Sequence, residues 1–415
     1  MMPGLALFEA GLLPAKHTIS IMMQVISGLL VLSSMWTIIG FSLAFGDTVA
    51  GVIGSPASYP MLINLRKGEC IPFAPTIPGF VYAIFQMMFA SITPLLMTGS
   101  FASRFKFSAF FVFIILWEII VYYPLAHWIW GGGWLSPSGT GFPEGEGVID
   151  FAGGITIHTS AGVGALVTAV MLGRRKNFLR KGGKYRASNL TTALLGATFL
   201  WLGWFGFNAG SAVSASEVTA IALANTQLAA CISGLSWMLL DWYHSGKPTL
   251  VETLNGTVAG LAGITPASGF VNPEWALLIG LILGLSSYVG VHILKHKLHI
   301  DDALDVCVVH GLTGMIGSLC IGLFASKDIN PLGQNGAFYG HPLQIVYQFL
   351  GVIVTSGWSA FWTFVLLVII DKVIGIRVTM EVEEKGLGVS EHGEHLDDFH
   401  FKARKTLPII LNHDE

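Results

Sequence analysis

Apolar runs of about twenty residues recur along the chain, and their length limits what it can fold into. A helix of about twenty apolar residues matches the hydrocarbon thickness of a bilayer. Lipid offers no hydrogen-bond partners to the backbone, so each such run must be a helix. Only 11% of the residues are charged, compared with about 25% in soluble domains. The sequence therefore predicts an all-α, polytopic membrane protein.

The apolar runs divide the chain into a membrane domain and a tail. The candidate spans are residues 20–44, 79–101, 107–129, 151–173, 189–210, 218–240, 249–270, 275–294, 303–325 and 343–370. The apolar segment 3–13 is too short to cross by itself, so we expect ten or eleven transmembrane helices. We place the membrane domain at residues 1–371 and a polar tail at residues 372–415.

Basic residues give the orientation of the spans. With residues 14–19 on the inside, thirteen Lys and Arg residues fall in inner loops and three in outer loops. Seven of the thirteen lie between Arg174 and Arg186. Cytoplasmic loops carry such an excess, so we expect the tail to be cytoplasmic.

One spacing occurs twice along the chain. Asp150, His158 and Gly162 reappear in the same spacing as Asp302, His310 and Gly314. The two spans cross the membrane in opposite directions, which predicts inverted five-helix repeats, about 1–187 and 188–342, before a final helix at 343–370. Eight helical residues rise about 12 Å, and the hydrocarbon core is about 30 Å thick. Both histidines therefore reach the midplane, where inverted-repeat transporters bind substrate.

Composition argues against several other classes of protein. The net charge is −3, which offers no basic field for nucleic acid. The four cysteines form no C-x-x-C pair, so we expect no zinc site and no disulfide framework. We find no catalytic arrangement of Ser or Cys with His, no P-loop and no cleavable signal peptide. We therefore predict that the chain is not an enzyme and carries no cofactor or metal.

His158 and His310 are the strongest site candidates from residue chemistry alone. A neutral imidazole accepts or donates hydrogen bonds and titrates near neutrality. Two imidazoles that share a proton would favour a guest that donates hydrogen bonds, which potassium cannot do. The alternatives are two satisfied core histidines or two axial ligands of a haem. No second histidine pair with similar placement supports the haem.

Several segments together resemble the ammonium transporter/Rh family on its bacterial, archaeal and plant side. They are WIWGGGWL (128–135), DFAGGITIH (150–158), WFGFNAGSA (204–212), GITPASGF (263–270), DDALDVCVVHG (301–311) and, in the tail, GIRVTMEVEEKGLGVSEHGE (375–394). The resemblance runs from Pro3 to about Glu394. It implies a homotrimer of eleven-helix protomers, each with a central pore that conducts ammonium, with methylammonium as a surrogate substrate.

The resemblance also implies roles for individual residues. Trp130, Ser211 and Phe89 resemble the outer site that recruits the cation. Phe89 and Phe207 resemble a stacked gate below it, and His158 and His310 the twin-histidine pair of the pore. The supporting positions implied around these residues are Asp150, Phe85, Gln86, Trp204 and Thr265.

Residue chemistry alone gives plainer interpretations of these positions. Trp130 suits an interfacial belt, and Ser211 suits a helix cap. Among 27 phenylalanines, a core role is the general expectation for Phe85, Phe89 and Phe207. Asp150 directly precedes its span and can cap it, as Asp301 and Asp302 can cap theirs.

The chain departs from the family pattern in three places. Glu9-Ala10-Gly11 stands where the family has an aromatic residue before a glycine. Compared with the family pattern, about half of the first helix is absent from this sequence. Glu118 lies in the middle of an apolar span, where an acid needs a protein partner. Gly388 stands where the tail usually has an acid.

We hypothesise that the chain takes up ammonium across the plasma membrane, driven by the electrochemical gradient. The alternatives are an Rh-like electroneutral channel for ammonia or carbon dioxide, an ammonium sensor that signals through its tail, and a haem redox protein. Expected partners are the lipid bilayer, two further copies of the chain and a cytoplasmic regulator at the tail.

Overall fold

The computed structural model is a bundle of helices and describes residues 1–65, 68–176, 178–179 and 185–396. Three basic residues of the run at 174–186, namely Arg180, Lys181 and Lys184, and the tail from residue 397 onward lie outside the described residues. Sheet structure among the described residues is one hairpin of β1 (Thr48–Val49) and β2 (Ile53–Gly54). The expected all-α class is confirmed.

Nine helical segments of the described ranges are long and apolar enough to cross a membrane. They are Ala15–Phe45, Gly79–Phe101, Phe107–Ile129, Gly154–Leu172, Leu190–Gly210, Glu217–Ser245, Pro273–Lys297, Cys307–Phe324 and Leu343–Val373. Each overlaps an expected span. Two shorter apolar helices accompany them, Met2–Leu12 and Leu250–Ile264.

The expected span at 249–270 is wrong at its C-terminal end. Its helix, α11 (Leu250–Ile264), stops after 15 residues, and residues 265–270 form turns. Pro266 follows the last turn of this helix, and a proline cannot donate the backbone bond that would continue it. Asn225 satisfies two carbonyl groups of the turn by donating to Ser268 O and Val271 O, both at 2.8 Å.

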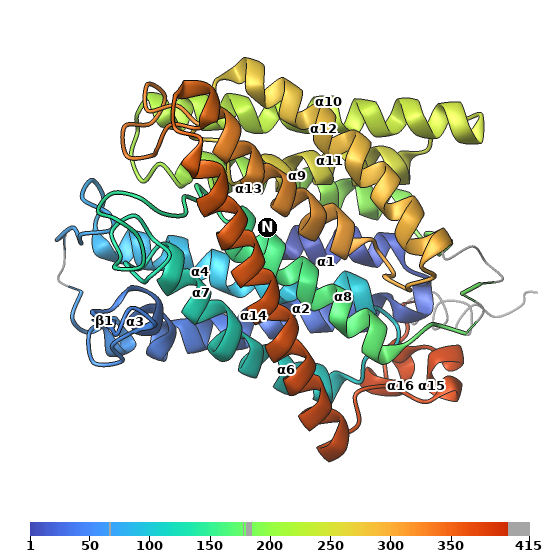
Figure 1. The fold of residues 1–415 in the computed structure, drawn as a ribbon. Coiled ribbons are helices and arrows are strands. Elements are labelled where there is room, and N and C mark those ends of the chain that lie inside the picture. The colour runs from blue at the N-terminus through green and yellow to red at the C-terminus, as the bar shows by residue number, and fades with distance from the viewer. Residues whose placement is uncertain (66–67, 177, 180–184, 397–415) are drawn as a thin grey trace, which may run out of the picture.

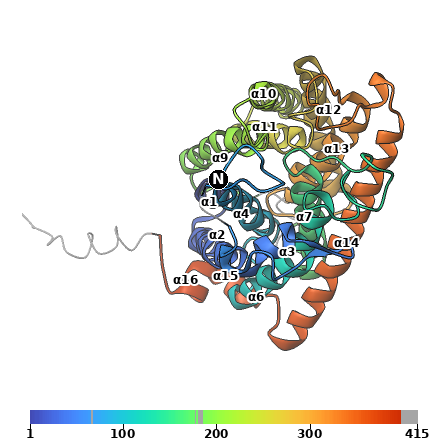
Figure 2. The same cartoon turned by 90° about the vertical axis from the view of Figure 1, so that its left-hand side faces the viewer.

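The helices of the described residues fall into two sets with corresponding contacts. In Figure 1 the first set, coloured blue to green, fills the lower half and the second, coloured green to orange, the upper half, and Figure 2 shows the same two sets from the side. The first set is α1 (Met2–Leu12), α2 (Ala15–Met35), α4 (Gly79–Leu95), α6 (Phe107–Trp117) with α7 (Tyr123–Ile129), and α8 (Ser160–Leu172). The second set is α9 (Leu190–Gly210), α10 (Glu217–Ser245), α11, α12 (Pro273–His292) and α13 (Thr313–Phe324). α2 packs on α4 and α6, as α10 packs on α11 and α12. α1 and α9 pack together where the two sets meet.

The last membrane-length helix, α14 (Leu343–Val373), lies outside this correspondence. It crosses the face of the bundle obliquely in Figure 1 and packs on α8, α13 and α6. Two short tail helices follow it, α15 (Met380–Lys385) and α16 (Leu387–His392), and α16 packs on α2. Gly388 is buried there: a Cβ built on it would lie 3.5 Å from Cβ of Ile19.

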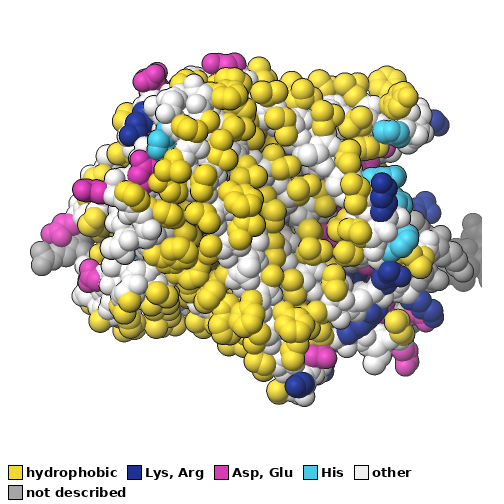
Figure 3. Space-filling model, viewed as in Figure 1, with side chains coloured by type: hydrophobic (Ala, Val, Ile, Leu, Met, Phe, Trp, Pro, Cys, Tyr) yellow, Lys and Arg dark blue, Asp and Glu magenta, His cyan; other side chains and the backbone are white. Residues whose placement is uncertain are grey.

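Charge divides the surface into a middle belt and two ends. Figure 3 shows a broad hydrophobic belt, with most of the visible Lys and Arg side chains gathered at the end where α15 and α16 lie. We call this end the basic end. The opposite end holds the hairpin and a large hollow described below, and we call it the vestibule end.

Candidate functional site

The two histidines lie on the inner walls of the bundle, each in a short π-helical turn. η4 (Gly154–Thr159) carries His158 and leads into α8, and η6 (Cys307–Leu312) carries His310 and leads into α13. The spans were expected to begin near residues 151 and 303, but the helices begin a few residues later. The aspartates of the repeated spacing therefore lie before the helices and cap them.

Asp150 caps the first turn of its helix with both carboxylate oxygens. Oδ1 accepts the backbone N–H groups of Gly153 and Gly154, and Oδ2 accepts those of Ile155 and Thr156, at 2.7 to 3.0 Å. Gly153 has φ 111°, a conformation that suits glycine and folds the chain back onto the carboxylate. Burial raises the pKa of Asp150, and the four backbone bonds oppose that shift. The helix that carries His158 thus starts from a fixed anchor.

Asp302 has the equivalent place in the second repeat. Its Oδ2 accepts the backbone N–H of Cys307 at 2.7 Å. Burial, followed by the nearby Asp305, raises the pKa of Asp302 to about 6. The carboxylates of the two repeats therefore anchor the two histidine helices from opposite ends of the bundle.

Glycines bring these two helices into backbone contact. A Cβ built on Gly162 would lie 2.2 Å from Cα of Gly311. One built on Gly314 would lie 2.8 Å from Cβ of His158. Both distances are shorter than any real Cβ contact, so larger residues would force the helices apart. Glycine at these positions allows the histidine side chains to meet.

The imidazole rings of His158 and His310 bond directly to each other. Their Nδ1 atoms are 3.2 Å apart, and the ring planes are inclined by 23°. In a neutral pair one Nδ1 carries the proton and the other accepts it, so the two rings have opposite tautomers. One Nε2 is then an acceptor and the other a donor. A direct bond also leaves no room for a porphyrin between the rings, which argues against the haem alternative.

Trp204 covers the histidine pair on one side. Its ring stacks on His158 with 5.7 Å between centroids and on His310 with 6.4 Å. The indole N–H donates to Oγ1 of Thr265 at 3.0 Å. Thr265 is the C-cap of α11, which ends at Ile264, so the early end of that helix fixes the position of the group that orients this tryptophan.

Two phenylalanine rings close the path toward the vestibule end. Phe89 of α4 and Phe207 of α9 stack with centroids 4.1 Å apart and planes inclined by 16°. Phe207 also lies 6.2 Å from the ring of His158, and Phe85 contacts Phe89 from the side at 4.7 Å. The structure therefore brings the expected gate residues together directly above the histidines.

Beyond the stack lies a vestibule of about 620 Å³. Trp130 and Ser211 line it, together with Phe89, Gln86 and Asp150. The ring of Trp130 meets Phe89 edge to face at 6.0 Å. Ser211 donates its hydroxyl to the carbonyl of Phe207 at 2.8 Å, which leaves its oxygen lone pairs available to a guest. Gln86 donates to the hydroxyl of Tyr82 at 3.2 Å.

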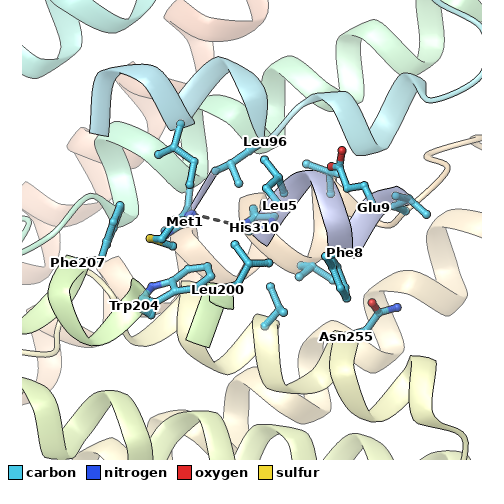
Figure 4. Close-up of a pocket in the computed structure, with 16 residues that line it drawn as sticks. Met1, Leu5, Phe8, Glu9, Leu96, Leu200, Trp204, Phe207, Asn255 and His310 are labelled. Atoms are coloured by element: carbon cyan, nitrogen blue, oxygen red, sulfur yellow. Dashed lines mark hydrogen bonds between the residues drawn. The ribbon is translucent and has the colours of Figure 1, made fainter. Parts of the chain in front are cut away.

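A narrow cavity of about 30 Å³ continues from the histidines toward the basic end (Figure 4). Its walls are mostly apolar, with Leu5, Leu96 and Leu200 among them. Two polar residues line it that the sequence interpretation did not assign to the site, Glu9 and Asn255. The signal for Glu9 was an acid inside the apolar segment 3–13.

Glu118 lies away from this path. It is fully buried at the start of a π-helical turn, η3 (Glu118–Tyr122), between α6 and α7. Its carboxyl group neighbours Tyr122 and Tyr123. It lines none of the cavities described above, and we give it no role in the site.

Comparisons with known proteins match nearly the whole chain to one family. The family model described as "Ammonium Transporter Family" matches residues 1–396. "Ammonium transporter 1" of Dictyostelium discoideum is 55% identical over 394 residues, which are 95% of this chain and 83% of that protein. The crystal structure of Saccharomyces cerevisiae Mep2 superposes with a TM-score of 0.82 at 34% identity, covering 91% of this chain and 87% of that one. A solved structure named "Sensor Amt Protein" gives a TM-score of 0.83 at 31% identity, covering 94% of both chains.

Proposed function

The chain belongs to the ammonium transporter family, and from this premise we propose that it moves ammonium across a membrane through the path between the vestibule and the basic end. Its relatives are named as transporters rather than enzymes. The observation that carries the mechanism is the direct Nδ1 bond between His158 and His310 in the wall of that path.

Recruitment takes place in the vestibule. Transfer of a bare cation out of water is costly, so the site must replace the lost water contacts. The faces of Trp130 and Phe89 supply cation–π attraction of about 0.5–2 kcal/mol. The oxygen of Ser211 accepts one N–H of the guest. Asp150 acts indirectly, because its carboxylate anchors the helix start and its carbonyl orients Trp130.

The stack of Phe89 and Phe207 is the gate. At a centroid separation of 4.1 Å the rings are in van der Waals contact, and no guest passes between them. Passage requires a ring rotation, supported laterally by Phe85. The gate separates the hydrated vestibule from the apolar lower path.

Below the gate, the histidine pair selects by hydrogen bonding. A guest with N–H groups donates to the Nε2 that lacks a proton, and a guest with a lone pair accepts from the other Nε2. Potassium can do neither, so apolar walls and the paired imidazoles together discriminate against it. Trp204, held by Thr265, keeps the two rings in this arrangement.

The distribution of basic residues gives the orientation of the chain in the membrane. We place the basic end in the cytoplasm, because basic residues gather on the inner side of membrane proteins. The tail then lies in the cytoplasm. The chain forms a homotrimer in the plasma membrane. Net flux follows the electrochemical gradient of ammonium.

Uptake of labelled methylammonium tests this function. Cells that lack their own ammonium transporters would express the chain, His158→Ala or His310→Ala. We expect uptake by the chain, competition by ammonium, and altered selectivity or loss of uptake in both variants. Surface-expressed chain without competed uptake would reject the function, and normal uptake and selectivity in both variants would reject the role of the histidines.

A sensor is the second candidate. The likeness to the structure named "Sensor Amt Protein" supports it, as do the contacts of the tail with the body. Lys16 donates to the carbonyl of Glu383 at 3.0 Å, and Leu387 N donates to Nδ1 of His17 at 3.4 Å. Removal of residues 380–415 that spares transport but abolishes an ammonium-dependent phenotype would favour the sensor. An Rh-like gas channel would instead give electroneutral flux with no ammonium-elicited current.

A further inference from the structure

Glu9 is an acid in the wall of the apolar half of the path, where the proposed transport steps use no acid. Its side chain is only 2% exposed, and it lines the same narrow cavity as His158 and His310. Figure 4 shows it near Leu5 and Phe8 on α1, beyond His310. An ionisable group inside a membrane protein is costly, so its presence calls for a function or a partner.

The partners of Glu9 in the structure are uncharged. Oε2 accepts the hydroxyl of Thr98 at 2.8 Å. Oε1 faces Gly99, where a built Cβ would lie only 2.7 Å away. The structure thus holds the carboxylate in place without balancing its charge.

Three buried basic side chains of the described residues are paired with other acids. Lys295 lies 2.7 Å from Oδ1 of Asp305. Arg104 lies 3.3 Å from Asp301, which also pairs with Arg175. In the part of the chain that the structure describes, no basic side chain forms an ion pair with Glu9.

A second carboxylate lies beside Glu9. Backbone N–H groups of Ala303 and Leu304 donate to the carbonyls of Ser100 and Gly99, both at 3.1 Å. These bonds seat the segment of Asp302 against the segment that holds Glu9, and Asp302 acts on Glu9 electrostatically. Oδ1 of Asp302 is buried and has no hydrogen-bond partner among the described residues. The charge of Asp302 therefore acts on Glu9, although its side chain is not among the residues that line the cavity.

The inverted repeat gives this region a counterpart. Asp150 anchors one histidine helix beside the vestibule, where the outer cation site lies. Asp302 anchors the other histidine helix from the basic-end side. The narrow cavity shares Asn255 and Leu304 with a second cavity of about 60 Å³, which Lys295 and Asp305 line. The cavity that Glu9 lines thus adjoins a second cavity on the side of Lys295 and Asp305.

We propose that Glu9 forms a second cation site, on the basic-end side of the histidine pair, that binds ammonium or methylammonium entering or leaving there. The carboxylate accepts N–H groups of the guest and supplies the negative charge that the apolar walls lack. Asp302 adds to the negative potential. This site rests on the proposed transport function, which supplies its ligand.

The sidedness of transport tests this site. Right-side-out and inside-out vesicles from the same expressing cells present opposite faces to labelled methylammonium. We expect Glu9→Gln to raise the apparent KM from the basic-end face roughly tenfold, as for loss of a hydrogen bond to a charged group. The apparent KM from the vestibule face should stay within about twofold of the original. Trp130→Leu should have the opposite effect: it should raise the apparent KM from the vestibule face and leave the apparent KM from the basic-end face nearly unchanged.

Two further variants separate charge from structure. Glutamine keeps an oxygen that accepts from Thr98, so Glu9→Gln removes charge and preserves that bond. Thr98→Val removes the bond and preserves the charge, and we expect it to raise the basic-end KM less than Glu9→Gln does. Glu9→Asp keeps the charge but shortens its reach, so it should raise the basic-end KM less than Glu9→Gln does. This variant tests the site if Glu9→Gln does not reach the membrane.

Each outcome has a distinct meaning. Equal KM changes at the two faces in Glu9→Gln, or none, would overturn the inner site. So would an equal effect of Thr98→Val, which would make Glu9 a structural acceptor, or an unchanged KM in Glu9→Asp. Absence of competed uptake by the unmodified chain at both faces would instead reject the transport function.

Discussion

The backbone carbonyl of Asp150 accepts the indole N–H of Trp130 at 2.8 Å, while the carboxylate of the same aspartate caps the helix of His158. One residue therefore fixes both the aromatic wall of the vestibule and the start of the helix that carries a pore histidine. The first two predictions separate these two contributions.

Asp150→Asn should weaken the helix cap. The amide oxygen replaces one carboxylate oxygen, but the amide NH₂ group faces the N–H groups that the other oxygen served. Each buried donor left without an acceptor costs about 1–3 kcal/mol, so we expect stability to fall by at least about 2 kcal/mol and uptake to be lost. Thermal unfolding and methylammonium uptake measure this, with exposed Asp328→Asn as the control. Unchanged stability would show that the cap contributes little.

Trp130→Leu should keep the fold and weaken recruitment. Loss of about 0.5–2 kcal/mol of cation–π attraction corresponds to a rise of about two- to thirty-fold in apparent KM. Trp201→Leu is the matched control, because Trp201 lies on α9 and its indole bonds Gln227 rather than the vestibule. An unchanged concentration dependence in Trp130→Leu would make Trp130 an interfacial residue only.

Gly162→Ala should separate the two histidine helices. The new Cβ would meet Cα of Gly311 at 2.2 Å, and such overpacking costs about 1–3 kcal/mol or more. We expect lower thermal stability and loss of uptake as the bond between the imidazoles lengthens. Gly357→Ala on α14 is the control, since a Cβ there meets nothing within 4 Å. Equal behaviour of the two variants would contradict the proposed close approach.

Adjacent tail acids should differ in their effect on docking of the tail. Glu383 is 6% exposed and accepts the backbone N–H of Lys176 at 2.9 Å and Arg377 at 3.0 Å. Glu384 is exposed and pairs with the side chain of Lys176 at the surface. We expect Glu383→Gln to speed protease cleavage of the tail several-fold and Glu384→Gln to leave it nearly unchanged. Equal cleavage rates would argue against anchoring by Glu383.

The protein should become less stable toward unfolding in acid, because the Asp301 carboxylate becomes protonated there. Burial raises the pKa of this carboxyl, but its bonds to Arg175 and the charge of Arg104 outweigh burial and bring the pKa below its usual value. A lowered folded-state pKa contributes stability that is present above about pH 4 and is lost as pH falls through the folded-state value. Asp301→Asn should cost about 3–5 kcal/mol at neutral pH, because it removes the buried carboxylate that balances the charges of Arg104 and Arg175.

Thermal unfolding of both proteins between about pH 7 and pH 3 measures this difference. The gap between the unmodified chain and Asp301→Asn should stay constant above about pH 5 and narrow below about pH 4. A gap that does not depend on pH would mean that Asp301 does not titrate in this way.

The membrane helices were predictable because hydrophobic length reports directly on the bilayer. The repeated spacing of Asp150, His158 and Gly162 also indicated that the two histidines would meet near the midplane. The early end of α11 was not predictable from hydrophobic length, since residues 265–270 continue the uncharged run but turn at Pro266. The late start of the histidine helices depends on where the two aspartates find backbone donors, which residue type alone does not specify.

The residues of the candidate site also include some that the sequence predicts and others that it does not. His158 and His310 stood out because a histidine is costly in an apolar span. Phe89, Phe207 and Trp204 did not stand out, since apolar rings in a membrane protein have the same pattern whether they line a path or fill the core. Only their resemblance to a family singled them out, and only three-dimensional packing brings Phe89 from α4 against Phe207 from α9.

The contact between Gly162 and Gly311 joins main chain to main chain. No side-chain volume intervenes there, so no substitution can bring the two histidine helices closer, and any added side chain forces them apart. This backbone contact therefore sets a lower limit to the spacing of the two imidazole rings. Differences in selectivity among chains built this way should therefore arise in the residues around the rings, such as Trp204 and the leucines below it.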